Sequence, residues 1–215
     1  MRFSEETPKT EEKEKPEDGE RIIFAPPEQK LRTVGIMGEI NDDTGAETVF
    51  GLLSLHNSAI HYEPVDIEDE DSEMKEVIMP IDMVISTPGG SADDMFAIYD
   101  TMRMIRDEVP IRTRGIGKVM SAGVVLLAAG TKGERSIGKN CRIMLHSVIG
   151  GHVGPMHQLD NEMEEIRNIQ DQYIAVLSEE TKMTKRYLRS LLKKKVNIYL
   201  SASEAVELGI ADNIF

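Results

Sequence analysis

Apolar and polar residues follow one another along the chain in runs that predict strands and helices in turn. Short apolar runs that end at turn residues predict strands at Leu31–Met37, Met79–Ser86, Ile111–Gly117 and Arg142–Leu145. Apolar residues spaced three or four positions apart predict helices at Ala46–Leu55, Asp93–Arg106 and Ser121–Ala129. Because strands that alternate with helices favour a mainly parallel sheet with crossover helices, we expect an α/β fold.

The pattern changes to one long helix over about residues 156–183. Its mostly apolar positions recur every three or four residues, with charged residues between them: Leu159, Met163, Ile166, Ile169 or Gln170, Tyr173 and Leu177. Such a stripe is usually ordinary core. On a helix of this length it could also form a seam between subunits.

The last part of the chain predicts shorter elements. A short helix is expected at Tyr187–Leu192 and an extended piece at Ile198–Leu200. Ser201 and Glu204 then form the pattern of a capping box, which starts a helix that Gly209 ends.

The net charge of −13 is concentrated in two segments. Residues 1–20 carry eight acidic and four basic residues, and residues 61–76 carry eight acidic residues and one lysine, so the rest of the chain is nearly neutral. Because the first segment has few apolar side chains, we expect a mobile acidic arm over residues 1–21, followed by one domain over 22–215. Repulsion between the carboxylates predicts a solvated loop in the acidic insertion 61–76.

Composition also limits the partners. A domain without a basic patch is a poor ligand for nucleic acid, and no apolar run is long enough to span a membrane. The charged start lacks the apolar centre of a signal peptide, and the single cysteine Cys141 excludes an internal disulfide. His152, His157 and Asp160 lack the spacing of a zinc site. We therefore expect a cytoplasmic protein with no metal, no cofactor, and neither nucleic acid nor membrane as a partner.

The chemistry is concentrated at three points where a predicted strand ends. Ser121 opens a predicted helix between Gly117 and Gly123, where a hydroxyl could act as a nucleophile beside free backbone N–H groups. Serine is also a preferred helix cap, and a cap is the more common role. His146 ends another strand, where a base would face the carboxyl edge of the sheet, although such a histidine is more often structural.

The third point is the glycine pair that follows Pro88. It could be only a tight turn from strand to helix. Alternatively, the N–H group of Gly90, which no side chain shields, could donate a hydrogen bond to an oxyanion.

Together these motifs resemble the ClpP family, the proteolytic subunits of Clp proteases. Ser86-Thr87-Pro88-Gly89-Gly90 with Ile98-Tyr99-Asp100-Thr101-Met102 is similar to the family's S-P-G-G…I-Y-D-T-M stretch, and Met120-Ser121-Ala122-Gly123 to its A-S-M-G nucleophile motif. Arg142–His146 resembles R-x-M-I-H, and Leu200–Asp212 resembles the family's L-S-A-x-E-A…G-L-V-D ending. The likeness extends from about Leu31 to Ile214, with every motif in order.

The resemblance implies a crotonase-like ββα spiral assembled in heptameric rings, normally stacked in pairs around a closed chamber. It implies that Ser121 is the nucleophile, that His146 is the base, and that the N–H groups of Gly90 and Ala122 form the oxyanion hole. The long helix would be the handle helix through which two rings meet. Substrates would be unfolded polypeptides delivered by a separate AAA+ unfoldase, and no cofactor is implied.

One catalytic position departs from the family pattern. The aspartate that precedes the L-S-A motif in the family corresponds here to Asn197. An asparagine carbonyl can accept the Nδ1–H of His146 but cannot supply the negative charge that stabilises an imidazolium. Lys193, Lys194 and Lys195, if close, would also oppose a positive charge on the histidine. The sequence therefore predicts a Ser-His-Asn peptidase whose activity is weak or conditional.

Two further departures concern partners. The insertion 61–76 lies near the surface that binds an unfoldase in the family, and the arm before Ile22 lacks the family's short apolar start. Both segments could be solvated surface without a specific function, or they could alter how the protein binds an unfoldase.

Other functions remain open on the same residues. The chain could be a catalytically weak or inactive ring subunit that scaffolds or modulates a partner or host Clp protease. A viral head-maturation protease or a signal-peptide peptidase could share the fold, but a membrane anchor and a lysine base are not evident. A crotonase that acts on CoA esters fits the motifs less well. The sequence has no G-x-x-x-x-G-K-[ST] pattern, so ATP would be used only by a separate unfoldase.

Overall fold

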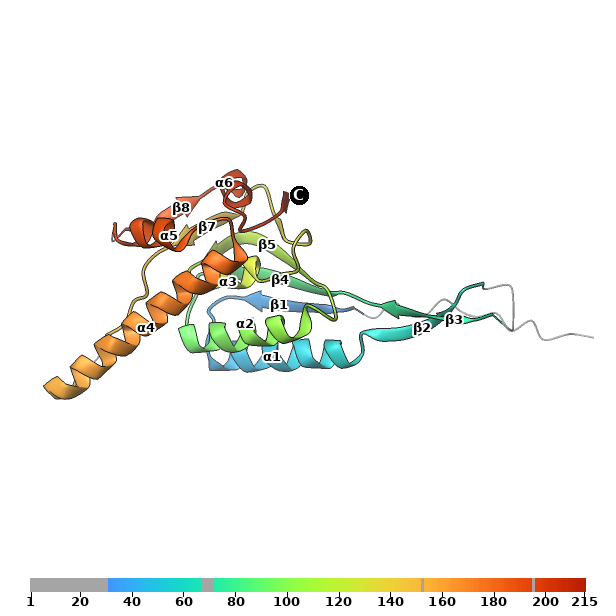
Figure 1. Cartoon of the computed structure of the whole chain (residues 1–215), viewed down its shortest axis with the longest axis horizontal. Coiled ribbons are helices and arrows are strands. Elements are labelled where there is room, and N and C mark those ends of the chain that lie inside the picture. The colour runs from blue at the N-terminus through green and yellow to red at the C-terminus, as the bar shows by residue number, and fades with distance from the viewer. Residues whose placement is uncertain (1–30, 67–71, 152, 195) are drawn as a thin grey trace, which may run out of the picture. The chain divides into compact units, whose positions relative to one another are not determined.

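The computed structural model describes residues 31–66, 72–151, 153–194 and 196–215 (Figure 1). One compact unit spans Arg32–Phe215. The predicted acidic arm 1–21 lies outside the described residues.

A parallel sheet forms the centre of this unit. Its strands lie in the order β1-β4-β5-β6-β9, and each neighbouring pair is parallel. Their bounds are Thr33–Met37 (β1), Ile81–Thr87 (β4), Ile111–Met120 (β5), Ser136–Ile137 (β6) and Asn213–Ile214 (β9). Alternate residues of β4 are fully buried, because each strand face meets a different environment. The predicted parallel α/β sheet is confirmed.

The strand β5 runs three residues beyond the predicted end at Gly117. Its first half pairs with β6, and its last residues, Lys118–Met120, pair instead with β7 (Arg142–Leu145). Gly117 has φ +60°, a conformation that glycine adopts without strain, and it lies between the two paired stretches. β7 also pairs in antiparallel fashion with β8 (Ile198–Leu200). This change of partner brings the end of β5 beside the end of β7.

Six helices are found in the described part of the chain. They are α1 (Asp42–Asn57), α2 (Ala92–Ile105), α3 (Ala122–Ala128), α4 (Met156–Glu180), α5 (Lys185–Leu192) and α6 (Ala202–Glu207). In Figure 1, α1 and α2 lie side by side along β1 and β4, and α4 passes next to α3. The capping box predicted at Ser201 is present: Ser201 accepts from the N–H of Glu204, whose carboxylate accepts from the N–H of Ser201.

The acidic insertion is not the simple solvated loop that its charge predicts. Its ends form an antiparallel hairpin of β2 (Ile60–Pro64) and β3 (Met74–Ile78), and Figure 1 draws it as an arm beyond the end of α1. Apolar residues on one face favour pairing: Ile60 and Ile78, which pair directly at the borders of the acidic sequence, and Tyr62 and Met74 within it. The prediction of a loop is therefore wrong for the ends of the insertion. Residues 67–71 lie outside the described residues.

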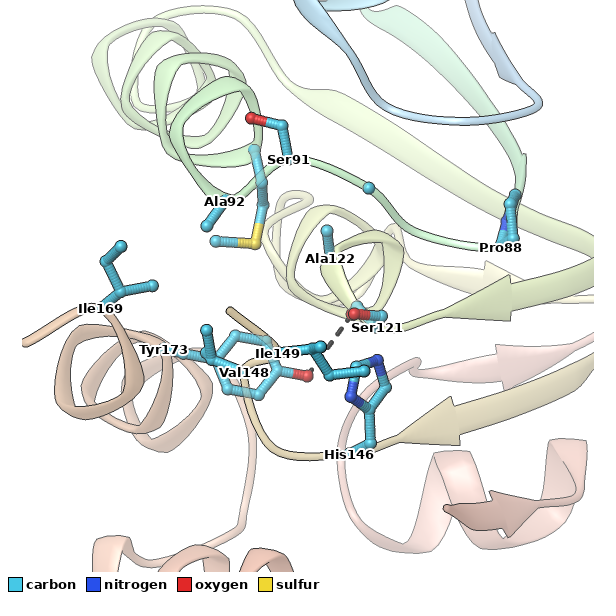
Figure 2. Close-up of a pocket in the computed structure, with 12 residues that line it drawn as sticks. Pro88, Ser91, Ala92, Ser121, Ala122, His146, Val148, Ile149, Ile169 and Tyr173 are labelled. Carbon is cyan, nitrogen blue, oxygen red and sulfur yellow. Dashed lines mark hydrogen bonds between the residues drawn. The ribbon is translucent and has the colours of Figure 1, made fainter. Parts of the chain in front are cut away.

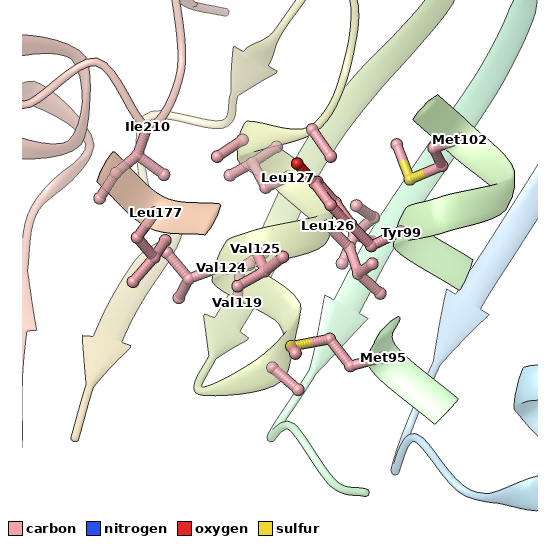
Figure 3. Close-up of a cluster of buried hydrophobic side chains, with 14 of the residues drawn as sticks. Met95, Tyr99, Met102, Val119, Val124, Val125, Leu126, Leu127, Leu177 and Ile210 are labelled. Carbon is pink, nitrogen blue, oxygen red and sulfur yellow. The ribbon is translucent and has the colours of Figure 1, made fainter. Parts of the chain in front are cut away.

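The core is packed around α3, whose seven residues are all buried. Figure 3 shows Val124, Leu126 and Leu127 of this helix between side chains of α2 and those of α4 and Ile210. A helix that is apolar on every side must be surrounded, because leaving any face in water would forfeit about 25 cal/mol for each Å² of apolar surface. This burial fixes where α3 begins, and therefore where Ser121 lies.

A buried carboxylate, Glu180, joins the end of α4 to the rest of the fold. Its side chain is 1% exposed and forms ion pairs with Arg103 (3.1 Å), Arg106 (2.9 Å) and Lys132 (2.9 Å). It also accepts a hydrogen bond of 3.0 Å from the hydroxyl of Tyr99. Desolvation acts to raise the pKa of Glu180, but hydrogen bonds and charge from Arg106 and Lys132 outweigh it and lower the pKa to about 2.

Two further features of the described ranges concern membranes and metals. Every helix there is too short or too polar to cross a bilayer. Within the same ranges, no group of three or more His, Cys, Asp or Glu side chains has a geometry that could hold a metal ion.

Candidate active site

The turn after β4 is built from two glycines that no other residue could replace without a clash. Gly89 has φ +100°, and a Cβ atom there would meet the Cβ of Ser121 at 2.6 Å. Gly90 has φ +156°, and a Cβ atom there would meet the carbonyl oxygen of Ile40 at 2.0 Å. The glycines therefore permit the chain to pass directly beside Ser121.

The backbone hydrogen bonds of this turn leave one donor unused. Ile40 donates to the carbonyl of Gly89 (2.9 Å) and accepts from the N–H of Ser91 (2.8 Å), in a bridge that flanks Gly90. The N–H of Gly90 has no acceptor among the described residues. An unpaired donor at the wall of a cavity is available to a ligand oxygen.

Ser121 lies between β5 and α3 in a strained conformation. Its φ is +52° and its ψ is −120°, and it is the one residue other than glycine with positive φ in the described part of the chain. Its side chain makes no capping hydrogen bond to α3. The interpretation of Ser121 as an ordinary helix cap therefore fails, and the hydroxyl is left free for another role. Strain of this kind costs about 1–3 kcal/mol and is concentrated at functional sites.

The change of partner by β5 places Ser121 next to His146. The N–H of Ser121 donates to the carbonyl of Met144 at 2.8 Å, two residues before His146 on the neighbouring strand. Figure 2 draws Ser121 and the imidazole of His146 at the same end of a cavity. Two residues that are 25 positions apart in the sequence thus line one cavity because their strands are paired.

The imidazole of His146 is held by the backbone beside it. Nδ1 lies 2.5 Å from the carbonyl oxygen of Ser147, which can only accept, so Nδ1 carries a proton and donates it. When the ring is neutral, Nε2 then has a free lone pair. This is the tautomer that a general base needs in order to accept a proton from a serine.

Asn197 is exposed and lies outside the lining of the cavity. No hydrogen bond joins it to His146 among the described residues, since Nδ1 is bonded to Ser147 instead. The backbone of Asn197 nevertheless lies only one residue beyond the paired strands that carry it next to His146. Leu145 pairs with Ile198, so extending β7 and β8 by one residue places His146 opposite Asn197. Directly opposite residues have Cβ atoms about 4.5–5.5 Å apart, so a change of rotamer could join the two side chains.

These residues surround a cavity of about 310 Å³. Its walls are the turn after β4, the start of α2, the start of α3, His146 with the segment after it, and one face of α4 (Figure 2). Of the predicted site residues, Gly90, Ser121, Ala122 and His146 line the cavity, and Asn197 does not. Ala122, at the first position of α3, also has an N–H group without an acceptor among the described residues.

The part that α4 plays in this cavity was not predicted from the sequence. Tyr173 and Ile169 belong to the stripe predicted as core or seam, yet both line the cavity. The hydroxyl of Tyr173 lies 3.4 Å from the carbonyl oxygen of Ser121, and Gln170 accepts a hydrogen bond of 2.8 Å from the N–H of Val148. A tyrosine within an otherwise aliphatic stripe was the one available signal, because a buried hydroxyl needs a partner.

A comparison with known protein families adds an independent finding. The model of the family described as Clp protease matches residues 71–215, roughly two thirds of the chain. The match includes Gly90, Ser121, Ala122, His146 and Asn197. The parallel sheet with its crossover helices agrees with the fold expected of that family.

Proposed function

The chain belongs to the Clp protease family, a family of peptidases, and from this premise we propose that it is a serine endopeptidase subunit with Ser121 as its nucleophile. The main support is Ser121 itself. It combines positive φ, a hydroxyl that caps nothing, a glycine turn packed against its Cβ, and a hydrogen bond to the strand that carries His146. A residue that serves only to start a helix needs none of these features.

In the proposed reaction, the Oγ of Ser121 attacks the carbonyl carbon of a peptide bond while Nε2 of His146 takes the hydroxyl proton. The N–H groups of Gly90 and Ala122 donate to the oxyanion that forms. His146 then protonates the leaving amine, which departs and leaves an acyl group on Ser121. Water, activated by the same imidazole, hydrolyses this ester and restores the free serine.

Asn197 is the proposed third member of the site, through the one-residue extension of β7 and β8. In the conformation described, the carbonyl of Ser147 occupies Nδ1, so Asn197 is needed only when His146 turns away from its neighbour. Neither acceptor carries a negative charge. The imidazolium formed during the reaction is therefore less stabilised than it would be beside an aspartate, which supports a weak or conditional activity.

We further propose that the chain works as a ring of subunits, as its family generally does. The outer part of α4 supports this proposal, because Met156 is 77% exposed and Met163 is 49% exposed on an apolar stripe that no described element covers. Stacking of two heptameric rings through this helix would bury the stripe and enclose the catalytic serines. The substrates would be unfolded polypeptides threaded by a separate AAA+ unfoldase, and native mass spectrometry tests the ring.

The direct test compares the two serines that line the cavity. Ser121→Ala removes a hydroxyl with no capping bond, whereas Ser91→Ala removes one that accepts from the N–H of Asp94. Turnover of a small peptide ester should fall at least about 10³-fold in the first variant and less than about tenfold in the second. Similar losses in both variants would reject Ser121 as the nucleophile.

The second candidate is a catalytically inactive ring subunit that modulates a partner or host Clp protease. The exposed Asn197, without a bond to His146, is the observation that favours it. An inactive subunit would show no turnover in any variant, including Asn197→Asp. It would still co-assemble with a catalytic ring.

A further inference from the structure

A side chain of α4 reaches the start of α3. The hydroxyl of Tyr173 donates to the carbonyl oxygen of Ser121 at 3.4 Å, the contact dashed in Figure 2. The same carbonyl also accepts from the N–H of Val124 at 3.0 Å, within the first turn of α3. Two donors from different elements therefore meet at this one oxygen.

The Ser121 carbonyl matters because of the peptide unit to which it belongs. A peptide is planar, so the C=O of Ser121 and the N–H of Ala122 lie in one plane and point in opposite directions. Any rotation of that plane moves both groups together. The N–H of Ala122 is a proposed oxyanion donor, so a contact that holds the Ser121 carbonyl also aims the donor.

This peptide plane has a reason to rotate. Ser121 is strained at φ +52°, and relaxation of φ and ψ toward ordinary values would turn the adjoining peptide. The contact from Val124 is local to α3 and would move with the helix. The contact from Tyr173 comes from another helix, 52 residues later in the sequence, and opposes the rotation.

Tyr173 is suited to this task by its surroundings. It is 4% exposed, and the bond to Ser121 is the one hydrogen bond found for its hydroxyl among the described residues. Burial raises the pKa of Tyr173, so the hydroxyl keeps its proton and remains a donor. A buried hydroxyl without a partner would cost about 1–3 kcal/mol. The bond to the carbonyl of Ser121 therefore also stabilises the buried hydroxyl of Tyr173.

We infer that Tyr173 is a positioning residue, which holds the Ser121–Ala122 peptide so that the Ala122 N–H points at the developing oxyanion. The inference rests on the proposed peptidase function. Tyr173 itself does not touch the reacting atoms. The hydroxyl acts through the peptide plane alone.

The test is Tyr173→Phe, which keeps the ring and removes the hydroxyl. A fluorophosphonate first counts the reactive serines, so that turnover of a peptide ester is expressed per competent site. We expect kcat per site to fall about 3- to 10-fold with KM unchanged, because an oxyanion donor acts mainly in the transition state. The pH at which kcat is half-maximal should not move, since His146 keeps its surroundings.

Tyr99→Phe is the matched control. Tyr99 is also a buried tyrosine of raised pKa, but its hydroxyl donates to Glu180, away from the cavity. This variant should lose stability and keep kcat per site.

Three results would overturn the inference. One is an unchanged kcat per site in Tyr173→Phe with a lower melting temperature, which would show a structural role. Another is a higher KM at constant kcat, which would show a substrate contact. The third is an equal loss of kcat in Tyr99→Phe. Failure of the proposed function is separate, because then the wild-type protein itself neither reacts with the fluorophosphonate nor turns over the ester.

Discussion

Two polar regions of this molecule, one buried around Glu180 and one at the cavity wall around Ser121, are built in opposite ways. Around Glu180, hydrogen bonds and ion pairs from Tyr99, Arg103, Arg106 and Lys132 satisfy both carboxylate oxygens. Around Ser121, the polar groups are left open. The hydroxyl caps nothing, and the N–H groups of Gly90 and Ala122 have no acceptor among the described residues.

The difference separates stability from chemistry. A charge that is paired on every side stabilises the fold but has no capacity left for a substrate. Open donors and a strained backbone cost stability but can receive a transition state without first breaking other bonds. Substitutions around Glu180 should therefore lower stability and leave activity almost unchanged. Substitutions around Ser121 should lower activity and leave stability almost unchanged.

The largest effect is expected at the open region. Ser121→Ala should lower peptide-ester turnover at least about 10³-fold, because the proposed nucleophile is lost. The free energy of unfolding should change by less than about 1 kcal/mol, since the hydroxyl has no capping bond to lose. Kinetics and urea denaturation check both parts. A large loss of stability with this substitution would show that the hydroxyl is structural and would break the comparison.

The reverse pattern is expected at the paired region. Glu180→Gln leaves Arg106 and Lys132 buried or half-buried beside one another without the charge that pairs them. The free energy of unfolding should fall by about 3–5 kcal/mol, while kcat per labelled site stays within about twofold. Glu179→Gln, one residue away on an exposed position, is the control and should change neither. Loss of kcat at unchanged stability would contradict the separation.

Acid should remove the stabilisation that comes from the paired region around Glu180. Because the pKa of Glu180 is about 2 in the folded protein and 4.5 in the unfolded chain, the folded state binds fewer protons between these values. The stability from this group is complete above about pH 4.5 and is lost as the pH falls toward 2, on the order of 3 kcal/mol. Denaturation at a series of pH values should show a shallower loss in Glu180→Gln. An identical slope in both proteins would show that Glu180 is not the source.

The smallest of these effects concerns Asn197. Asn197→Asp introduces a negative charge opposite His146 in the extended register of β7 and β8. We expect kcat to rise about tenfold. Replacement of aspartate by asparagine in a Ser-His-Asp protease lowers kcat about 10⁴-fold. The effect should be smaller here, because Ser147 already orients the imidazole. Ester turnover measures it, with Asn197→Ala as the control for the loss of the amide. An unchanged rate would mean that the asparagine costs nothing.

The sequence predicted those parts of the fold that depend on local patterns. Helical periodicity placed α2 and α4, short apolar runs placed β4 and β7, and the Ser201 capping box was correct. The hairpin in the acidic insertion was missed, because charge count outweighed a few apolar residues whose value depends on cross-strand pairing. The division of β5 between β6 and β7 was also hidden, since register is a property of two strands.

The candidate site divides in a similar way. Ser121, His146, Gly90 and Ala122 could be proposed from motifs at strand ends, and the fold brings them to one cavity. The positive φ of Ser121 and its missing cap bond could not be read from the sequence, because serine favours the opposite behaviour at helix starts. Tyr173 was hidden in a stripe whose spacing is that of a core helix.

Covalent labelling with a fluorophosphonate, followed by peptide mass mapping, shows whether Ser121 is a reactive nucleophile that depends on His146. We expect modification at Ser121, at a rate that falls about 10³-fold or more in His146→Ala. A wild-type protein that remains unlabelled, a label on another serine, or an equal rate without His146 would contradict it.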